Sequence, residues 1–209
     1  MKYQAALFDM DGVILDSEPL HLAAFRATLL GHGYSLSDED YKQHFAGRTD
    51  EAGFKSYFDF VNESVELPVV MDKKARAYLE LAKNQLVAYP GVAPLVRELA
   101  ERMPLALVTG SLRLEAEAAM EALGLTDSLK VIVAAEDVEK SKPDPEGYLT
   151  AARLLGIDPA HCVVVEDAPK GIQAALAVGM DCIAVTNTHT AKELSSASVI
   201  VGSLSPSLF

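Results

Sequence analysis

The sequence predicts an α/β protein with a doubly wound parallel sheet and a helical segment inserted after the first strand. Three observations lead to this expectation. Short apolar runs alternate with helical stretches in the second half of the chain, whereas residues 17–88 show a helical pattern without a strand-like run. In addition, polar residues directly follow several of the apolar runs. In α/β sheets, ligand crevices lie at the carboxyl ends of the strands.

The first strand is expected at Ala5 to Phe8, a short apolar run that ends at two carboxylates, Asp9 and Asp11. Two charges at the carboxyl end of a parallel strand are costly unless a cation neutralises them or one of them holds a proton. Gly12 lets the backbone turn away. Asp-Met-Asp-Gly on its own fits a surface turn equally well, so residues elsewhere must decide between a turn and a charged site.

The inserted segment is expected to contain four helices. Ser17, Ser37 and Thr49 can each cap the start of one helix, and Ser37-Asp-Glu-Asp is typical of a capping box. The fourth helix is expected from Met71 to about Asn84. Tyr89-Pro90-Gly91 then breaks the chain.

Beyond this break, strands alternate with helices. The strands are expected at 104–108, 131–134, 162–165, 182–185 and 199–201, and the helices at 112–123, 144–155 and 169–178. Parallel strands that are buried on both faces read as continuous apolar runs, which is the pattern of this part of the chain. We therefore predict a doubly wound sheet with helices on both faces.

Composition limits the classes of function. At 209 residues, half of them apolar, the chain can bury a full core, as one domain or as one domain with a smaller inserted one. Its 18 basic and 30 acidic residues give a formal net charge of −12, which argues against nucleic acid or an anionic membrane as a partner. An anionic substrate must then be held by a metal ion or by a few placed cations.

The two cysteines, Cys162 and Cys182, both lie in apolar runs. We expect buried thiols in a reduced compartment rather than a disulfide. No charged leader followed by a long apolar segment opens the sequence, and no run approaches membrane-spanning length. These features predict a cytoplasmic protein, with a monomer favoured.

The ends of the predicted strands bring further polar residues toward Asp9 and Asp11. Thr109-Gly110-Ser111 follows the second strand, Lys142 lies in the loop after the third, and Glu166-Asp167 ends the fourth. Each of these alone also fits a turn, a solvated loop or a helix cap. Together, a hydroxyl with backbone N–H groups, an ammonium and several carboxylates suit a phosphate held beside a divalent cation such as Mg²⁺.

These motifs resemble those of the haloacid dehalogenase superfamily across essentially the whole chain. The matching residues are Asp9-Met10-Asp11-Gly12-Val13, Thr109-Gly110-Ser111, Lys142-Pro143 and Glu166-Asp167. The resemblance implies an α/β core at residues 1–15 and 89–209 with an α-helical cap domain at residues 16–88. Asp16-Ser17-Glu18-Pro19-Leu20-His21 and Glu166-Asp167-Ala168 with Gly171 are most similar to the β-phosphoglucomutase-like branch, which contains both sugar-phosphate phosphatases and mutases.

The resemblance also implies a mechanism. Asp9 would be the nucleophile that forms an aspartyl-phosphate, and Asp11 would act as general acid and base. The implied ligands of Mg²⁺ are Asp9, Asp167 and the backbone carbonyl of Asp11, with Glu166 as a further ligand or a residue behind one. The implied phosphate-binding residues are Thr109, Gly110, Ser111 and Lys142.

The cap would contact the rest of the substrate, and His21, Arg48 and Lys74 are the residues expected to do so. His21 also fits a boundary or core histidine on an amphipathic helix. Arg48 and Lys74 match only loosely the basic residues that grip the second phosphate in the mutase. Lys73 or Arg76 could take the place of Lys74.

Three functions are compatible with this pattern. The first is a Mg²⁺-dependent phosphatase of small phosphomonoesters such as hexose phosphates or phosphoglycolate. The second is a β-phosphoglucomutase, in which a sugar hydroxyl replaces water at the same aspartyl-phosphate centre. The third is a non-catalytic binding protein on the same fold, against which the intact set of acidic residues and Lys142 argues. Asp11 argues against dehalogenase chemistry, which usually lacks the second aspartate. We predict the phosphatase, acting on a small phosphorylated metabolite.

Overall fold

The computed structural model describes residues 2–46 and 48–209 and divides the chain into two compact units. The first unit comprises residues 1–17 and 86–209, and the second comprises residues 18–85. From the sequence, these boundaries were expected at 15/16 and 88/89.

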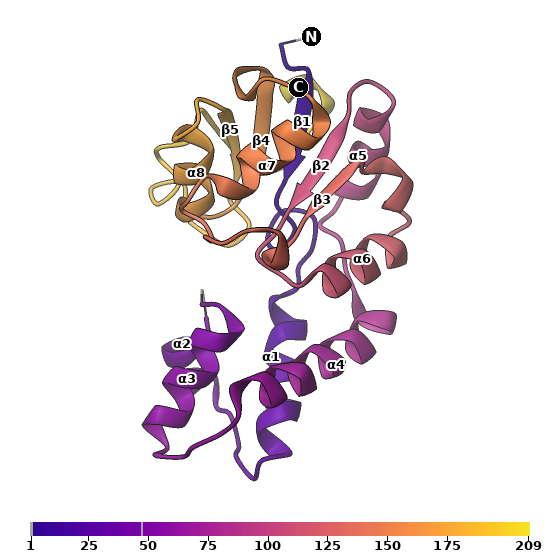
Figure 1. Cartoon of the computed structure of the whole chain (residues 1–209). Helices are drawn as coiled ribbons and strands as arrows, with labels where there is room; N and C mark the ends of the chain where they lie inside the picture. The colour runs from indigo at the N-terminus through magenta and orange to yellow at the C-terminus, as the bar shows by residue number, and fades with distance from the viewer. Residues whose placement is uncertain (1, 47) are drawn as a thin grey trace. The chain divides into compact units, whose positions relative to one another are not determined.

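Within the described residues, the first unit contains a six-stranded parallel sheet, and the predicted fold class is confirmed. Its strands are β1 (Ala5–Phe8), β2 (Leu105–Val108), β3 (Val131–Val133), β4 (Cys162–Glu166), β5 (Asp181–Val185) and β6 (Val199–Val201). The strand order is β3-β2-β1-β4-β5-β6, so the chain runs outward on one side of β1 and then on the other (Figure 1). The order therefore reverses between β1 and β4, and this is where doubly wound sheets open a crevice for ligands.

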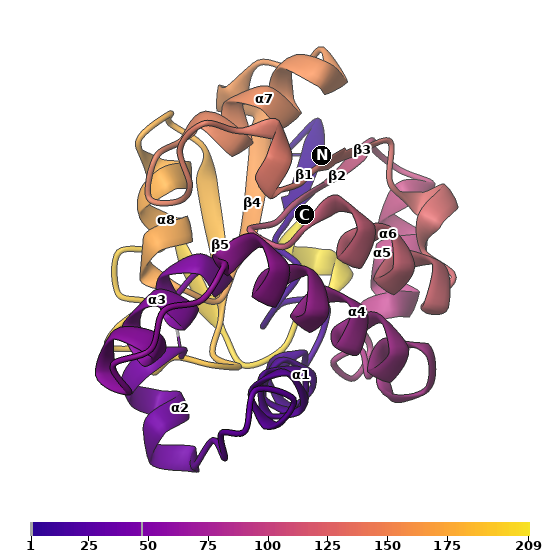
Figure 2. The same cartoon turned by 60° about the horizontal axis from the view of Figure 1, so that its bottom comes forward.

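Helices cover both faces of this sheet, two on each face among the described residues (Figures 1 and 2). Their ranges are α5 (Val92–Ala100), α6 (Arg113–Ala122), α7 (Glu146–Leu155) and α8 (Pro169–Leu176). β1 shows the period of two: Ala6 and Phe8 face the core under α5 and α6, and Ala5 and Leu7 face the core under α7 and α8. Because both faces are covered, the strand has to be apolar throughout.

Helix α5 was not predicted from the sequence. It begins after Gly91, whose φ of 79° is in the left-handed region, and it follows directly on the break at Tyr89-Pro90. Val92, Leu95, Val96 and Leu99 are buried at helical spacing, so the signal was present in the sequence. Pro90 and Gly91 therefore lead directly into α5, and no long loop follows them.

The second unit is helical, as predicted. It contains α1 (Glu18–Leu30), α2 (Asp38–His44), α3 (Asp50–Phe60) and α4 (Leu67–Gln85). Aromatic rings fill its core, and α1 packs along α4 while α2 packs beside α3 (Figure 2). Ser37 and Thr49 cap α2 and α3 as expected, since their side chains accept from the N–H groups of Asp40 and Ala52.

Helix α4 begins four residues before the predicted start, at Leu67 rather than Met71. Pro68 in its first turn is compatible with a helix, because the first N–H groups of a helix have no intrahelical partner. In the first unit, Cys162 and Cys182 are buried free thiols, as predicted. Among the described helices, none combines the length and the apolar character that crossing a membrane requires.

Candidate active site

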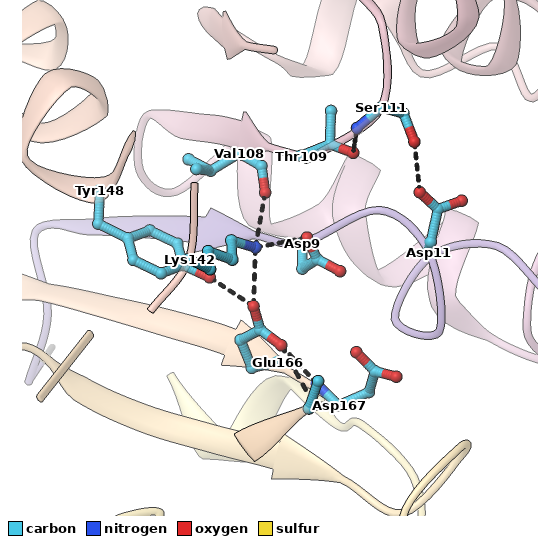
Figure 3. A network of polar contacts seen from close by, with 10 residues as sticks. Asp9, Asp11, Val108, Thr109, Ser111, Lys142, Tyr148, Glu166 and Asp167 are labelled. Carbon is cyan, nitrogen blue, oxygen red and sulfur yellow. Dashed lines mark hydrogen bonds and ion pairs between the residues drawn. The ribbon is translucent and has the colours of Figure 1, made fainter. Parts of the chain in front are cut away.

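The predicted site residues of the first unit meet at the carboxyl ends of three adjacent strands. β1 lies between β2 and β4, and Phe8 is in register with Leu107 on one side and Val165 on the other. Asp9, Thr109 and Glu166 therefore come to one edge of the sheet, and the backbone N–H of Asp9 donates to Val165 O at 3.0 Å. The loop after β3 brings Lys142 to the same place (Figure 3).

Lys142 is the charged centre of this group. Its ammonium donates to Asp9 Oδ1 at 2.6 Å, to Glu166 Oε1 at 2.7 Å and to the backbone carbonyl of Val108 at 3.1 Å. All three of its N–H groups are thus used. Burial alone would lower the pKa of Lys142, but the charges of Asp9 and Glu166 outweigh it and raise this pKa above its ordinary value. Lys142 is therefore a permanent positive charge beside Asp9.

The acidic residues respond differently to this ammonium. For Glu166, burial raises the pKa, but Lys142 outweighs burial and the net pKa is lowered. For Asp9, burial dominates over Lys142, and Glu166, Asp167 and Asp11 add repulsion, so its pKa is well above the ordinary value. Burial also raises the pKa of Asp167, to about 6. The single ammonium thus leaves the pKa values of Asp9 and Asp167 raised, and a bound cation would lower both.

The residues fit a divalent cation on their donor chemistry as well. Carboxylate oxygens of Asp9, Glu166 and Asp167, all buried, lie within 4.8 Å of one another. Oxygen donors of this kind are those that Mg²⁺ and other hard cations prefer. Asp167 is oriented by the loop after β5, where the hydroxyl of Thr188 donates to its Oδ2 and lies 2.8 Å from His189 Nδ1.

Asp11 lies on the other side of the group and points toward Ser111 (Figure 3). Ser111 Oγ donates to Asp11 Oδ2 at 2.7 Å, and Ser17 Oγ donates to Asp11 Oδ1. The carboxylate is therefore held by a hydroxyl at each oxygen. Ser17 directly precedes α1, the position at which its cap was predicted, and its hydroxyl donates to Asp11.

Thr109 and Ser111 form a tight turn at the end of β2. The backbone N–H of Ser111 donates to Thr109 Oγ1 at 3.0 Å, and the N–H of Thr109 donates to Val133 O at 2.9 Å. Thr109 is buried, whereas Gly110 between the two is exposed. The turn places the residues that were predicted to bind phosphate next to Asp11.

Gly12 is packed against Asp167, and this contact leads to a testable prediction. Its φ is +83°, and a Cβ at this position would lie 2.1 Å from Asp167 Oδ2. Gly12→Ala is expected to displace the Asp167 carboxylate, to weaken Mg²⁺ binding, and to cost about 1–3 kcal/mol of stability through backbone strain. Isothermal titration with Mg²⁺ and urea unfolding measure the two effects.

Gly110→Ala is the matched control, because nothing lies within 4 Å of a Cβ at Gly110. Equal losses of Mg²⁺ affinity in the two variants would contradict the proposed role of the Gly12–Asp167 contact.

The predicted cap residues lie in the second unit, and the structure shows how each is placed there. Lys74 is fully buried, with its ammonium 2.9 Å from Asp50 Oδ2 and 2.9 Å from His21 Nδ1. His21 stacks on Tyr78, with ring centroids 4.6 Å apart. Lys74 is therefore paired in the interior of its own unit, whereas Arg48 is exposed.

Several polar residues around the site have roles that were not predicted from the sequence. Tyr148 donates its hydroxyl to Glu166 Oε1 at 2.7 Å, Thr188 holds Asp167, and Asn187 Nδ2 donates to Gly12 O at 2.7 Å. Asn187 and Thr188 lie in the loop that begins one residue earlier, at the end of β5, and this is the edge of the sheet where the other site residues lie, so the rule of strand ends could have found them. Tyr148 lies inside a helix, and no local pattern indicated its role.

An α/β fold with buried carboxylates and one ammonium at the switch point of the sheet defines an enzyme-type site for an anionic substrate and a cation. The family model of haloacid dehalogenase-like hydrolases matches residues 6–185. A validoxylamine A 7′-phosphate phosphatase of Streptomyces hygroscopicus subsp. limoneus is 36% identical over 205 residues, which cover 97% of this chain and 94% of the relative. The fructose-1-phosphate phosphatase YqaB of Escherichia coli is 34% identical over 184 residues, 88% of this chain and 97% of the relative.

Solved structures agree with these relatives. The crystal structure of CbbY from Rhodobacter sphaeroides in complex with phosphate has a TM-score of 0.85 and 26% identity, and the match covers 96% of this chain and 94% of that one. The chain therefore belongs to the haloacid dehalogenase-like hydrolases, and it is a phosphatase, a phosphoric monoester hydrolase, of that family.

Proposed function

We propose that this protein is a Mg²⁺-dependent phosphatase of small phosphorylated carbohydrates that works through an aspartyl-phosphate at Asp9. The observation that carries the proposal is the position of Asp9: a carboxylate at the end of the central strand, 2.6 Å from the ammonium of Lys142 and next to Asp11. A carboxylate is a weak nucleophile unless a neighbouring group or a metal activates it. Lys142 provides part of that activation.

The other residues have separate tasks in this proposal. Asp11 gives a proton to the leaving oxygen and later takes one from the attacking water, and the hydroxyls of Ser17 and Ser111 fix the direction of its carboxylate. Thr109 and the backbone of the turn at Gly110 bind phosphoryl oxygens. Asp9, Asp167 and the Asp11 backbone carbonyl would hold Mg²⁺, which when bound supplies positive charge between the nucleophile and the phosphate.

The names of the relatives support carbohydrate phosphates as the substrate class. One is named as a phosphatase of fructose 1-phosphate and another as a phosphatase of validoxylamine A 7′-phosphate. With a net charge of −12, the protein relies on placed cations and a metal to hold such an anion.

The surroundings of Ser111 favour hydrolysis over the mutase reaction, which needs a grip on a second phosphate. Arg113 follows this turn, but its guanidinium is paired with Asp137 and Glu117, and its backbone N–H donates to Glu136 at 3.0 Å. Acidic side chains thus already pair with the guanidinium of Arg113 and accept from the first N–H group of α6. A mutase must keep its phosphoenzyme from water while it holds a distal phosphate.

A panel of phosphomonoesters assayed with Mg²⁺ tests this proposal. It includes fructose 1-phosphate, glucose 6-phosphate, hexitol phosphates and phosphoglycolate, with free phosphate as the readout. β-Glucose 1-phosphate with catalytic glucose 1,6-bisphosphate is run beside them and coupled to detection of glucose 6-phosphate. We expect phosphate release from at least one carbohydrate phosphate to exceed isomerisation. Rapid isomerisation with negligible phosphate release from every ester would assign the protein to the mutases.

A further inference from the structure

Glu166 lies close enough to Asp9 and Asp167 to be taken for a metal ligand, but its carboxylate is fully occupied by hydrogen bonds. Oε1 accepts from the ammonium of Lys142 and from the hydroxyl of Tyr148, both at 2.7 Å. Oε2 accepts from the backbone N–H groups of Asp167 at 3.0 Å and Ala168 at 3.1 Å. A carboxylate has about four acceptor positions, and here four donors fill them.

The conformation of the Glu166 side chain agrees with these four hydrogen bonds. Glu166 folds back over the start of α8, where a Cβ at Gly171 would lie 1.7 Å from Glu166 Oε1 and 1.9 Å from its carboxyl carbon. Only a residue without a side chain leaves room for this conformation. The carboxylate is thus seated on the loop and the first turn of the helix that follows its own strand.

Lys142 is held with equal completeness. Its three N–H groups reach Asp9, Glu166 and Val108 O, and the ammonium lies 5.0 Å from the centre of the Tyr148 ring. Tyr148 is 1% exposed, so ring and hydroxyl have a single position. A charge-assisted hydrogen bond in such a dry environment is both strong and directional.

We propose that Tyr148 is a positioning residue of the reaction: through its hydrogen bond to Glu166 it directs Lys142 at Asp9. This inference rests on the proposed function and assigns a task within it: Asp9, Asp167 and the Asp11 carbonyl are left for the metal, and Tyr148 becomes a positioning residue of the reaction. The phenol keeps the Glu166 carboxylate directed at the ammonium, and the ammonium in turn is directed at the nucleophile.

The first arm of the test measures Mg²⁺ binding to the purified full-length chain by isothermal titration calorimetry. Glu166→Gln combined with Lys142→Met removes one negative and one positive charge, so that the net charge around the site is unchanged. Gln also keeps an oxygen for the two backbone N–H groups that Glu166 accepts from. We expect Mg²⁺ affinity of this double variant within about 3-fold of the wild type, whereas Asp167→Asn loses at least about 10-fold because a ligand is removed.

A loss in the double variant as large as that in Asp167→Asn would overturn the proposal. Circular dichroism checks that each variant folds. If the double variant does not fold, Glu166→Gln alone is compared with Asp167→Asn, and an equal loss of affinity again overturns it. Because this arm needs no substrate, a chain that hydrolysed no ester would refute the proposed function without changing the interpretation of Mg²⁺ binding.

The second arm measures turnover of Tyr148→Phe, which keeps the ring and removes only the donor. We expect kcat to fall about 10-fold while KM and Mg²⁺ affinity stay within about 2-fold, because positioning of Lys142 affects the charged transition state. Tyr3→Phe is the matched control: Tyr3 is also buried and donates to a carboxylate, Asp181 Oδ2 at 2.9 Å, at the start of β5. Unchanged kcat in Tyr148→Phe, or an equal fall in Tyr3→Phe, would show that the Tyr148 hydroxyl has no positioning role.

Discussion

Asp9→Asn is expected to lower phosphate release by about 10⁴-fold or more, because an amide has no nucleophilic oxygen of comparable strength. The substitution keeps the shape of the side chain and an oxygen that can accept from Lys142, which lies 2.6 Å away. It also removes the buried negative charge of Asp9, which Glu166, Asp167 and Asp11 repel. The fold should therefore survive, and steady-state assays at high enzyme concentration measure the residual rate.

Asp127→Asn is the control for this prediction, since Asp127 lies exposed in a 3₁₀ turn before β3. It should leave the rate unchanged. An Asp9→Asn protein with near-native activity on any good substrate would show that Asp9 is not the nucleophile.

Removal of Mg²⁺ by a chelator is expected to lower turnover by about 10³-fold, and restoring excess Mg²⁺ should recover it. The physical reason is repulsion: Asp9, Glu166 and Asp167 are buried together with Lys142 as their neighbouring cation, and a phosphate would add further negative charge. Asp167→Asn should reproduce the effect of the chelator even in millimolar Mg²⁺. Full activity in chelator would contradict the metal site.

The same arrangement predicts how Mg²⁺ binding depends on pH. Burial raises the pKa of Asp167 to about 6, so below that pH the metal-free protein holds a proton that Mg²⁺ must displace. Mg²⁺ affinity should therefore decrease as the pH falls through about 6, and the raised pKa of Asp9, the other proposed carboxylate ligand, acts in the same direction. Titrations at pH 5, 6, 7 and 8 test this, and an affinity that stayed constant across all four would contradict the raised pKa.

The fold and the main site residues could be predicted from the sequence because both depend on the same local pattern. Asp9, Thr109 and Glu166 each directly follow an apolar run, and a parallel sheet brings such positions to one edge without any knowledge of packing. The reversal of strand order at β1 places them at the crevice. The apolar runs and the residues that follow them were thus sufficient to predict the sheet and the residues at its carboxyl edge.

Side-chain contacts between distant elements could not be predicted in this way. Tyr148 reaches Glu166 only because α7 packs on the face of the sheet over β1, β2 and β3, and a tyrosine within a helix has no sequence signal for such a contact. Ser17 lies where the cap of α1 was predicted, and nothing in the local sequence indicated that its hydroxyl also donates to Asp11. In the helical unit, Lys74 was expected to contact the substrate, and the sequence did not indicate that its side chain is buried beside Asp50 and His21. The same short polar motif can face solvent or contact a distant element, and tertiary packing decides which of the two occurs.

The most direct test of the aspartyl-phosphate at Asp9 is a pre-steady-state reaction of Asp11→Asn with excess p-nitrophenyl phosphate. This ester needs no proton on its leaving group, so the first transfer can proceed, whereas discharge to water lacks its general base. The account predicts a burst of about one p-nitrophenolate per enzyme molecule, followed by acid-quenched protein with a phosphoryl group on the peptide that contains Asp9. A burst with the phosphoryl group on another residue, or steady release of product with no phosphorylated peptide at any time, would contradict it.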